Sequence, residues 1–273
     1  MHLGNMKKIM ISGLLTFSTA SSLPMVMMNP VHAEGEATQV NTWGEENGAK
    51  VYYGADGQKV TGAVKIGDTY YGFKADGALD SKGFKTYGTK NYYVNNDGTL
   101  AKGWQAIGNY AYYFSKTDAT RVYNKKVKYL KIGKSGRLGK AYAQAIRLMN
   151  KNGWTLKKAF HYSAHLKFAN KNLRRKTPEA YATIGFSKKA GNCFVMAATF
   201  YVQAKLLGYN VHQVSGYVGA SKAQHSWCYI TQKGKKWLYD PDVTNEFKRP
   251  GYHFREGAKG TLKYQKSGRK LLG

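Results

Sequence analysis

Residues 191–208 read Gly-Asn-Cys-Phe-Val-Met-Ala-Ala-Thr-Phe-Tyr-Val-Gln-Ala-Lys-Leu-Leu-Gly, and this stretch decides how the C-terminal half of the chain is organised. Asn192 is a good N-cap and Gly208 a good helix stop, so a helix is predicted between them. That helix is apolar on nearly every side and should therefore be buried. Cys193 falls in its first turn, where unpaired backbone N–H groups and the helix dipole favour a thiolate over a thiol.

A histidine and an aspartate follow this helix at strand positions. The stretches His225-Ser-Trp-Cys-Tyr-Ile-Thr and Trp-Leu-Tyr-Asp240 read as a hairpin whose turn contains Gly234. Folding the hairpin places His225 roughly opposite Asp240. A nucleophilic thiol needs an imidazole, and the imidazole needs an acceptor that fixes its tautomer. Cys193, His225 and Asp240 are therefore the candidate catalytic triad, and strand parity makes Cys228 a packed structural residue.

The motifs Gly-Asn-Cys, Leu-Gly-Tyr, His-Ser-Trp and Tyr-Asp-Pro, within about residues 138–255, resemble the transglutaminase-like superfamily. The resemblance implies a papain-like α+β fold and acyl transfer through a thioester. It assigns Cys193 as nucleophile, His225 as general base and acid, and Asp240 as the residue that orients the imidazole. It also implies an oxyanion hole that includes the Cys193 backbone N–H. Some members crosslink glutamine side chains and others hydrolyse peptide bonds, and the residues leave that choice open.

Other chemistries find less support. His161 and His165 are spaced i,i+4 on a predicted helix, as metal ligands can be, but the glutamate of a zincin motif is absent and no third ligand lies nearby in the sequence. A glycosidase needs two carboxylates at a set separation, and residues 122–273 contain only five acidic residues. We therefore expect no metal and no cofactor.

Upstream, residues 34–121 carry three markers that share a period of 20–21 residues, which indicates a repeat array. Asp-Gly between short aromatic strands is a hairpin signal, so each repeat is predicted to be a β-hairpin that stacks on the next to form a solenoid. The markers are the tyrosine pairs beginning at Tyr52, Tyr70, Tyr92 and Tyr112; the Gly-x4-Gly segments 62–67, 83–88 and 103–108; and the turn tripeptides 55–57, 75–77 and 96–98.

This array resembles the cell-wall-binding repeats of choline-binding and glucan-binding proteins, in which aromatic residues of neighbouring hairpins form ligand boxes. The position that the family fills with Trp is Trp104 in one repeat but Phe84 and Ala63 in two others. These aromatic residues could equally be the stacked core of the array. The candidate wall-ligand residues are Trp104 with Tyr112 and Tyr113, followed by Tyr92, Tyr93 and Phe84.

Charge divides the chain sharply. The 273 residues carry a formal net charge of +28, and 43 Lys and Arg stand against 15 Asp and Glu. Residues 34–121 are neutral, with ten basic and ten acidic residues, whereas residues 122–273 hold 31 basic against five acidic residues. We therefore place a domain boundary near residue 122, with 122–137 as a basic linker strand and 138–273 as the catalytic domain.

The N-terminus reads as a secretion signal over residues 1–33. Lys7 and Lys8 form a positive n-region, an apolar stretch follows, and Val31-His32-Ala33 suits signal cleavage. We expect no transmembrane anchor after cleavage. Export makes nucleic acid an improbable partner and the anionic polymers of a Gram-positive cell wall or surface a plausible one.

These features predict an exported, wall-associated cysteine acyltransferase or peptidase that acts on amides of the envelope, such as peptidoglycan stem peptides or surface proteins. The alternative is a non-enzymatic wall-binding adhesin whose basic domain binds anionic wall polymer.

Overall fold

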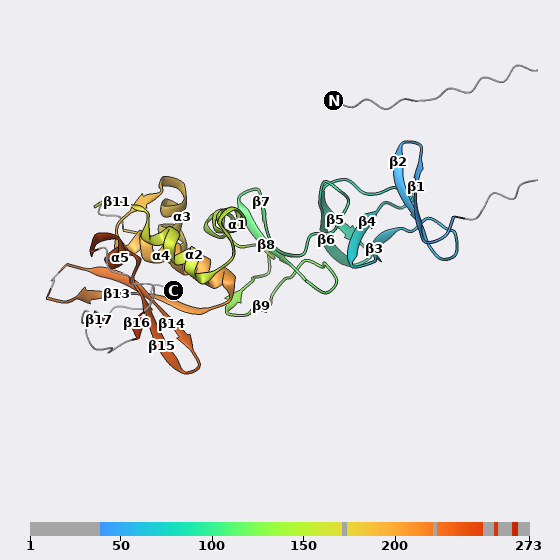
Figure 1. The fold of residues 1–273 in the computed structure, drawn as a ribbon. Helices are drawn as coiled ribbons and strands as arrows, with labels where there is room; N and C mark the ends of the chain where they lie inside the picture. Colours follow the sequence, from blue (N-terminus) through green and yellow to red (C-terminus); the bar gives the residue numbers. More distant parts are fainter. Residues whose placement is uncertain (1–38, 171–173, 221–222, 248–253, 256–263, 267–273) are drawn as a thin grey trace, which may run out of the picture. The chain divides into compact units, whose positions relative to one another are not determined.

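The computed structural model describes residues 39–170, 174–220, 223–247, 254–255 and 264–266 (Figure 1). The predicted signal peptide, residues 1–33, lies outside the described residues. In the part that is described, no helix has the length and apolarity needed to cross a membrane.

Residues 42–138, here called the hairpin array, contain the predicted series of antiparallel hairpins. Neighbouring hairpins are joined by backbone hydrogen bonds, for example from Leu100 N–H to the Tyr70 carbonyl at 2.7 Å and from Arg121 N–H to the Asn91 carbonyl at 2.8 Å. The first four hairpins are β1 (Thr42–Glu46) with β2 (Ala49–Tyr53), β3 (Gly62–Ile66) with β4 (Thr69–Phe73), β5 (Gly83–Tyr87) with β6 (Lys90–Val94), and β7 (Gly103–Ile107) with β8 (Tyr110–Phe114).

The Asp-Gly tripeptides do not form the hairpin tips, which corrects the sequence prediction. The first tip is Asn47-Gly48, where both residues have positive φ, and the other tips place Gly67, Gly88 and Gly108 at φ near +57° (58, 59 and 55°). Glycine adopts this conformation without the strain that a Cβ atom would cause. The tripeptides instead turn the chain from one hairpin to the next, where Asp56, Asp76 and Asp97 each accept a hydrogen bond from a backbone N–H two residues later.

Residues 122–137 were expected to be a linker strand, but they form a short fifth hairpin, β9 (Lys126–Val127) with β10 (Leu130–Lys131). Leu130 and Ile132 are buried. The turn from Gly133 to Gly136 has the same N–H to carbonyl hydrogen bond as the turn at Gly54–Gly57. The sequence pattern did not predict this hairpin, because its strands are only two residues long and contain lysines but no tyrosine pair.

The remaining described residues form the α+β domain, in which helices pack against one sheet (Figure 1). Thr155 and Thr177 cap two of the helices by accepting hydrogen bonds through their side chains. The helices are α1 (Lys140–Asn152), α2 (Leu156–Ala164), α3 (Pro178–Lys188), α4 (Cys193–Leu207) and α5 (Pro241–Phe247).

Helix α2 ends at Ala164, before a tertiary strand pairing. Leu166 is buried, and the chain continues as β11 (Lys167–Phe168), which pairs with β12 (Ala190–Gly191). The Lys167 N–H donates to the Lys189 carbonyl at 3.0 Å, so a tertiary pairing stops the helix where no local signal does.

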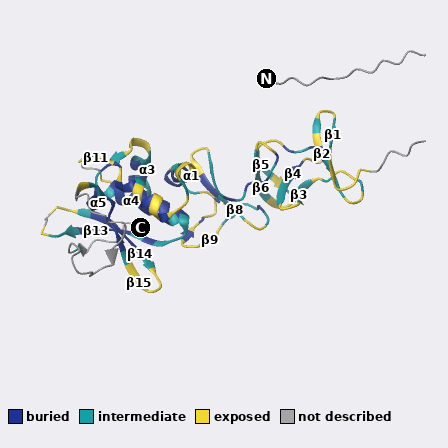
Figure 2. Ribbon diagram, in the orientation of Figure 1, coloured by how far each residue is buried: buried dark blue, intermediate teal, exposed yellow. Residues whose placement is uncertain are grey.

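Helix α4 is the centre of the domain and has the predicted bounds. The Asn192 side chain accepts from the Val195 N–H, Gly208 ends the helix at φ 86°, and twelve of the fifteen helical residues are buried (Figure 2). Gly185 of α3 allows a close approach, because a Cβ there would lie 2.1 Å from Thr199 Oγ1. The buried amide of Gln203 is satisfied by the Ala159 carbonyl and the Ser163 hydroxyl.

A five-stranded antiparallel sheet in the order β16-β15-β14-β13-β17 covers α4. Cys228 lies on the face toward α4, is fully buried, and its thiol contacts the Ala197 carbonyl at 3.2 Å, as expected of a packing residue. The opposite face holds Trp227, Tyr229 and Leu238. The strands are β13 (Asn210–Val218), β14 (His225–Gln232), β15 (Lys235–Tyr239), β16 (Phe254–Arg255) and β17 (Tyr264–Lys266).

Candidate active site

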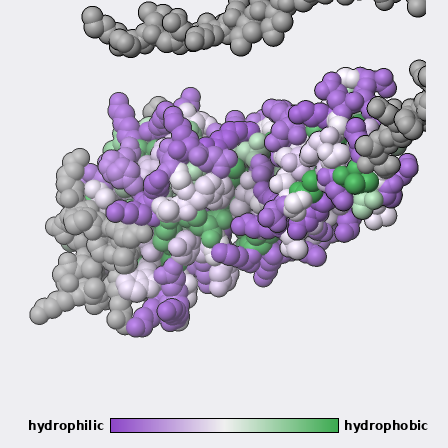
Figure 3. Space-filling view, turned by 45° about the vertical axis from the view of Figure 1, so that its right-hand side comes forward, coloured by the Kyte–Doolittle hydropathy of each residue, from purple (hydrophilic) through white to green (hydrophobic). Residues whose placement is uncertain are grey.

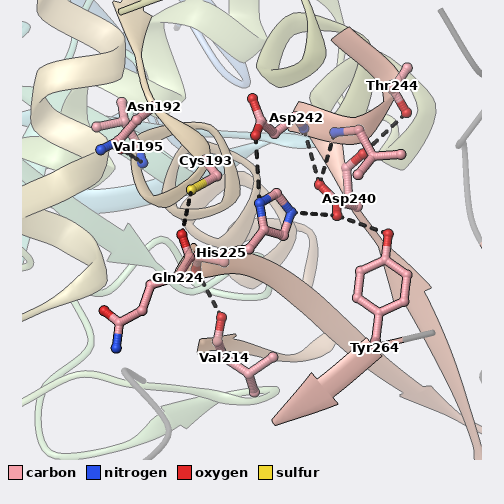
Figure 4. Close-up of polar contacts among 12 residues, drawn as sticks. Asn192, Cys193, Val195, Val214, Gln224, His225, Asp240, Asp242, Thr244 and Tyr264 are labelled. Carbon is pink, nitrogen blue, oxygen red and sulfur yellow. Dashed lines mark hydrogen bonds and ion pairs between the residues drawn. The ribbon is translucent and has the colours of Figure 1, made fainter. Parts of the chain in front are cut away.

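The three predicted triad residues lie together at one end of the sheet (Figure 4). Cys193 begins α4, His225 begins β14, and Asp240 follows β15 directly. The Cys193 side chain is only slightly exposed, and its sulfur lies 4.0 Å from the Gln224 carbonyl oxygen. The Cys193 sulfur also lies within 4.8 Å of a ring nitrogen of His225. Residues far apart in the sequence are thus assembled by helix α4 packing on the sheet.

Asp240 binds the imidazole and caps a helix at the same time. Its Oδ2 lies 2.7 Å from His225 Nε2, and its Oδ1 accepts from the N–H groups of Asp242 and Val243 at the start of α5. The Asp240 side chain is fully buried. A carboxylate only accepts hydrogen bonds, so Nε2 carries the proton in this contact. Nδ1 is then the ring nitrogen that faces the thiol side (Figure 4).

The environment keeps His225 in its charged form. Burial by itself would lower the pKa of the imidazole, but the charge and hydrogen bond of Asp240, helped by Cys193, outweigh it and raise the pKa of His225 to about 11. At neutral pH the site therefore holds an imidazolium beside the Cys193 sulfur.

Two further residues belong to the site and were missed by sequence reasoning. The Tyr264 hydroxyl donates to Asp240 Oδ2 at 2.9 Å, from a strand 24 residues downstream with no motif to mark it. Asp242 Oδ2 lies 3.6 Å from His225 Nδ1, on the ring edge opposite Asp240. Burial raises the pKa of Asp242 to about 7, reinforced by Asp240 and Glu246 and opposed by His225. The only sequence signal for Asp242 is that it lies two residues after Asp240.

One group of three potential metal ligands occurs in the described ranges, namely Cys193, His225 and Asp242. The sequence-based candidates His161 and His165 stack with ring centroids 3.9 Å apart, and His165 Nδ1 lies 2.7 Å from the His161 carbonyl oxygen. No third ligating side chain joins that pair among the residues that the structure places.

The predicted wall-ligand residues do not form one box. Phe84 is well exposed and contacts Tyr93 and Tyr112 with centroids 5.0 Å away in each case. The Arg121 guanidinium covers the rings of Phe84 and Tyr112 at 5.1 and 4.6 Å, so a side chain of the protein itself occupies the cation position. Tyr92 is buried in the core between hairpins.

Trp104 and Tyr113 are separated from Tyr112, because neighbouring strand residues point to opposite faces. Their rings pair at 4.9 Å and line a cavity of about 410 Å³ together with Trp154, Leu206 and other residues of the α+β domain. Trp104 also packs against the main hydrophobic core. The predicted grouping of Trp104 with both tyrosines is therefore wrong for Tyr112.

Sequence reasoning also missed an aromatic box at Trp43. This side chain is 40% exposed and contacts the rings of Tyr52 and Tyr71 at 5.3 and 5.0 Å. A cavity of about 440 Å³ beside it is lined by Glu45 and Asp97 and also by Lys50, the cross-strand partner of Glu45. Trp43 pairs with Tyr52 across its hairpin as Trp104 pairs with Tyr113, so the repeat register could have identified it.

Comparison with protein-family models and with curated proteins finds no match. Solved structures that are similar to part of the chain include choline-binding proteins and an endolysin. Choline binding protein F from Streptococcus pneumoniae is 23% identical, with a TM-score of 0.30 over 35% of this chain and 32% of that one. The modular Cpl-1 endolysin, complexed with a peptidoglycan analogue, is 25% identical, with a TM-score of 0.27 over 31% and 25%. A choline binding domain from S. pneumoniae is 36% identical, with a TM-score of 0.20 over 22% and 80%.

The chain thus spans about a third or less of the length of the first two structures. The overlaps are partial, and nothing about the thiol site follows from them.

Proposed function

We propose that this chain is an exported thiol enzyme that cleaves or transfers amide acyl groups through a thioester at Cys193. The observation that carries the proposal is the 2.7 Å contact between His225 Nε2 and Asp240 Oδ2, with the Cys193 sulfur at the other side of the same imidazole. An oriented imidazolium beside a thiol at a helix start is the arrangement that activates a cysteine. The transglutaminase-like resemblance of the motifs points to the same reaction class.

The residues divide the reaction as follows. The Cys193 thiolate attacks the amide carbonyl carbon, and the His225 imidazolium gives its Nδ1 proton to the departing amine, leaving an acyl thioester. Water or a second amine then attacks the thioester and passes its proton to Nδ1, which restores the thiolate and imidazolium. Asp240 keeps its hydrogen bond to Nε2 throughout, with Tyr264 and the α5 backbone holding the carboxylate in place.

The proposed substrate class follows from the proposed export of the enzyme to the cell wall. The candidate amides are peptidoglycan stem peptides and surface proteins, and the acceptor is water or an amine. Incubation with stem peptides and a labelled amine separates these outcomes, because hydrolysis and amine incorporation give products of different mass.

Alkylation with iodoacetamide tests the thiol proposal. Cys193 should react rapidly near neutral pH, and His225→Ala should react slowly because the imidazolium is lost. Cys228 is a built-in control, since complete burial raises the pKa of its thiol well above the usual value and blocks access. Equally slow labelling of Cys193 in both proteins would rule out an activated thiol.

A second candidate function, wall binding, is supported by the Trp43 box. The Trp43 and Tyr71 rings line the cavity together with two carboxylates and one lysine, and exposed aromatic faces beside carboxylates suit a quaternary ammonium group. The similar structures named above include choline binding proteins. Hydrophilic side chains cover much of the described surface drawn in Figure 3. The excess of basic residues in 122–273 would attract an anionic wall polymer.

Retention of the full chain on purified cell wall separates the two modes of binding. If the aromatic box binds the wall, free choline should release the protein and Trp43→Ala should weaken retention. If the basic residues bind it, salt should release the protein steeply and Trp43→Ala should have little effect. Phe168→Ala is the control, because this exposed aromatic residue lies outside the hairpin array.

A further inference from the structure

The Cys193 thiol, the His225 imidazole and the Asp242 carboxylate have the geometry of a metal site. One ligand atom from each lies within 4.8 Å of the other two, and His225 Nδ1 is 3.6 Å from Asp242 Oδ2. Zinc bonds of ~2.0–2.3 Å at tetrahedral angles place two ligand atoms ~3.3–3.6 Å apart. The His225–Asp242 distance therefore already matches the spacing that one Zn²⁺ ion requires, and side-chain movement of about 1 Å would bring the sulfur to the same spacing.

Asp242 provides the second, independent observation. The residue is 4% exposed, and its Oδ1 is buried with no hydrogen-bond partner among the described residues. A buried, unsatisfied carboxylate oxygen is costly, so the Asp242 carboxylate is open to a further ligand, with Oδ2 as the oxygen nearer to His225 Nδ1. Asp240 differs, because both of its oxygens accept hydrogen bonds from protein groups. The acyl-transfer steps given above use Asp240 and leave Asp242 without a role.

We propose that Cys193, His225 and Asp242 bind a Zn²⁺ ion reversibly and that the ion blocks the thiol. One thiolate, one imidazole and one carboxylate form a ligand set typical of zinc, with the fourth position left for water. Asp240 stays bound to Nε2 and so orients the imidazole as a zinc ligand in the way that second-shell carboxylates do.

The step is an exchange of a proton for a metal ion. Zn²⁺ takes the Nδ1 lone pair, the proton leaves to solvent, and the two negative ligands balance the charge of the ion without any change of oxidation state. While the sulfur lone pair is held by zinc it cannot attack an amide. The inhibition rests on the proposed function, whereas zinc binding does not.

Calorimetry with Zn²⁺ on the untagged, metal-free full chain tests the binding. We expect one tight site per chain, loss of that site in Cys193→Ser, and an affinity lower by about tenfold or more in Asp242→Asn. His161→Gln is the matched control and should bind as the wild type does. Wild-type affinity in Asp242→Asn, or loss of the site in His161→Gln, would overturn the proposal.

Protection of Cys193 from iodoacetamide provides a second readout. It can be measured on the wild-type protein, so it does not depend on a variant that could fail to fold. Zn²⁺ should slow alkylation of Cys193 by about tenfold or more, and a chelator should restore it. Rapid alkylation that zinc leaves unchanged would refute the metal site and leave the thiol enzyme intact. Slow, His225-independent alkylation together with tight zinc binding would refute the thiol enzyme and leave the metal site intact.

Discussion

The hairpin array and the α+β domain build their sites in different ways. In the array, aromatic contacts lie within one hairpin, as between Trp43 and Tyr52, or join it to the adjacent hairpin, as between Trp43 and Tyr71. In the α+β domain, the His225 imidazole lies beside Cys193 of helix α4, Asp242 of helix α5 and Asp240 between β15 and α5, and Tyr264 of β17 in turn holds Asp240. The array should therefore lose function one hairpin at a time, whereas the thiol site should be lost as a whole.

The largest expected effect is on the thiol site. Asp240→Asn removes the negative charge that orients the His225 imidazole and favours its protonated form. Mutation of the equivalent aspartate in other catalytic triads lowers turnover by about 10⁴-fold. We expect acyl transfer to fall by about 10³-fold or more, and alkylation of Cys193 to slow. Time courses of product formation and of iodoacetamide incorporation would measure the two rates.

Asp80→Asn is the control for this change, because Asp80 is a buried carboxylate of the hairpin array that pairs with Lys85. It should leave the alkylation rate at the wild-type value. An equal loss in both variants would mean that the two regions are not independent.

Truncation of a buried aromatic side chain should destabilise only the region that contains it. Phe200 is fully buried between Phe160 and Tyr239, so Phe200→Ala should lower the free energy of unfolding of the α+β domain by about 3–5 kcal/mol. Phe73→Ala removes an equally buried ring from the array. Hydrogen exchange read by mass spectrometry should show lost protection throughout α4 and the sheet in the first variant, and only in neighbouring hairpins in the second. Loss of protection across the whole chain in Phe73→Ala would contradict the comparison.

Gly191 and Gly88 should both resist substitution, Gly191 because of close packing and Gly88 because of its backbone conformation. A Cβ on Gly191 would lie 2.3 Å from the Val195 Cβ in the first turn of α4, so Gly191→Ala should cost about 1–3 kcal/mol by overpacking and slow the alkylation of Cys193. Gly88 has open space around it but a φ of +59°, so Gly88→Ala should cost about 1–2 kcal/mol through backbone strain alone. Urea unfolding gives the energies, and unchanged alkylation in Gly88→Ala is the expected contrast.

The smallest expected effects are on pH dependence, and they have opposite signs. In the array, burial opposes ionisation of Asp80, but the bonds from Lys85 and Tyr87 prevail and lower its pKa. That stabilisation is present above the unfolded pKa of about 3.9 and is lost as pH falls through the lower folded value. The raised pKa of His225 stabilises the α+β domain fully below an unfolded value of about 6.5, and this is lost as pH rises through about 11.

Thermal unfolding measured across pH would show both effects, as a loss of stability at acid pH (the acid limb) and another at alkaline pH (the alkaline limb). Asp80→Asn should flatten the acid limb, and His225→Ala should flatten the alkaline one. If the limbs exchanged between the variants, the assignment of each pKa shift to its region would be wrong.

Sequence patterns predicted most of the local structure. The bounds of α4 followed from Asn192, Gly208 and the apolar run between them, and the repeat period located the hairpins. The hairpin tips were misplaced because Asp-Gly serves equally well in the turns between hairpins. The fifth hairpin was missed because its strands are two residues long and lack the tyrosine pair.

The sequence by itself determined which residues could act as nucleophile, base and orienter, because residue type and order specify those roles. Only the tertiary structure decided which groups share the imidazole and which aromatic rings are free. Asp242 and Tyr264 reach His225 and Asp240 through helix capping and strand pairing, which carry no motif. Arg121 covers Phe84 through a contact between hairpins, while Trp43 remains exposed. Such contacts depend on packing between segments distant in the chain, and local sequence does not encode them individually.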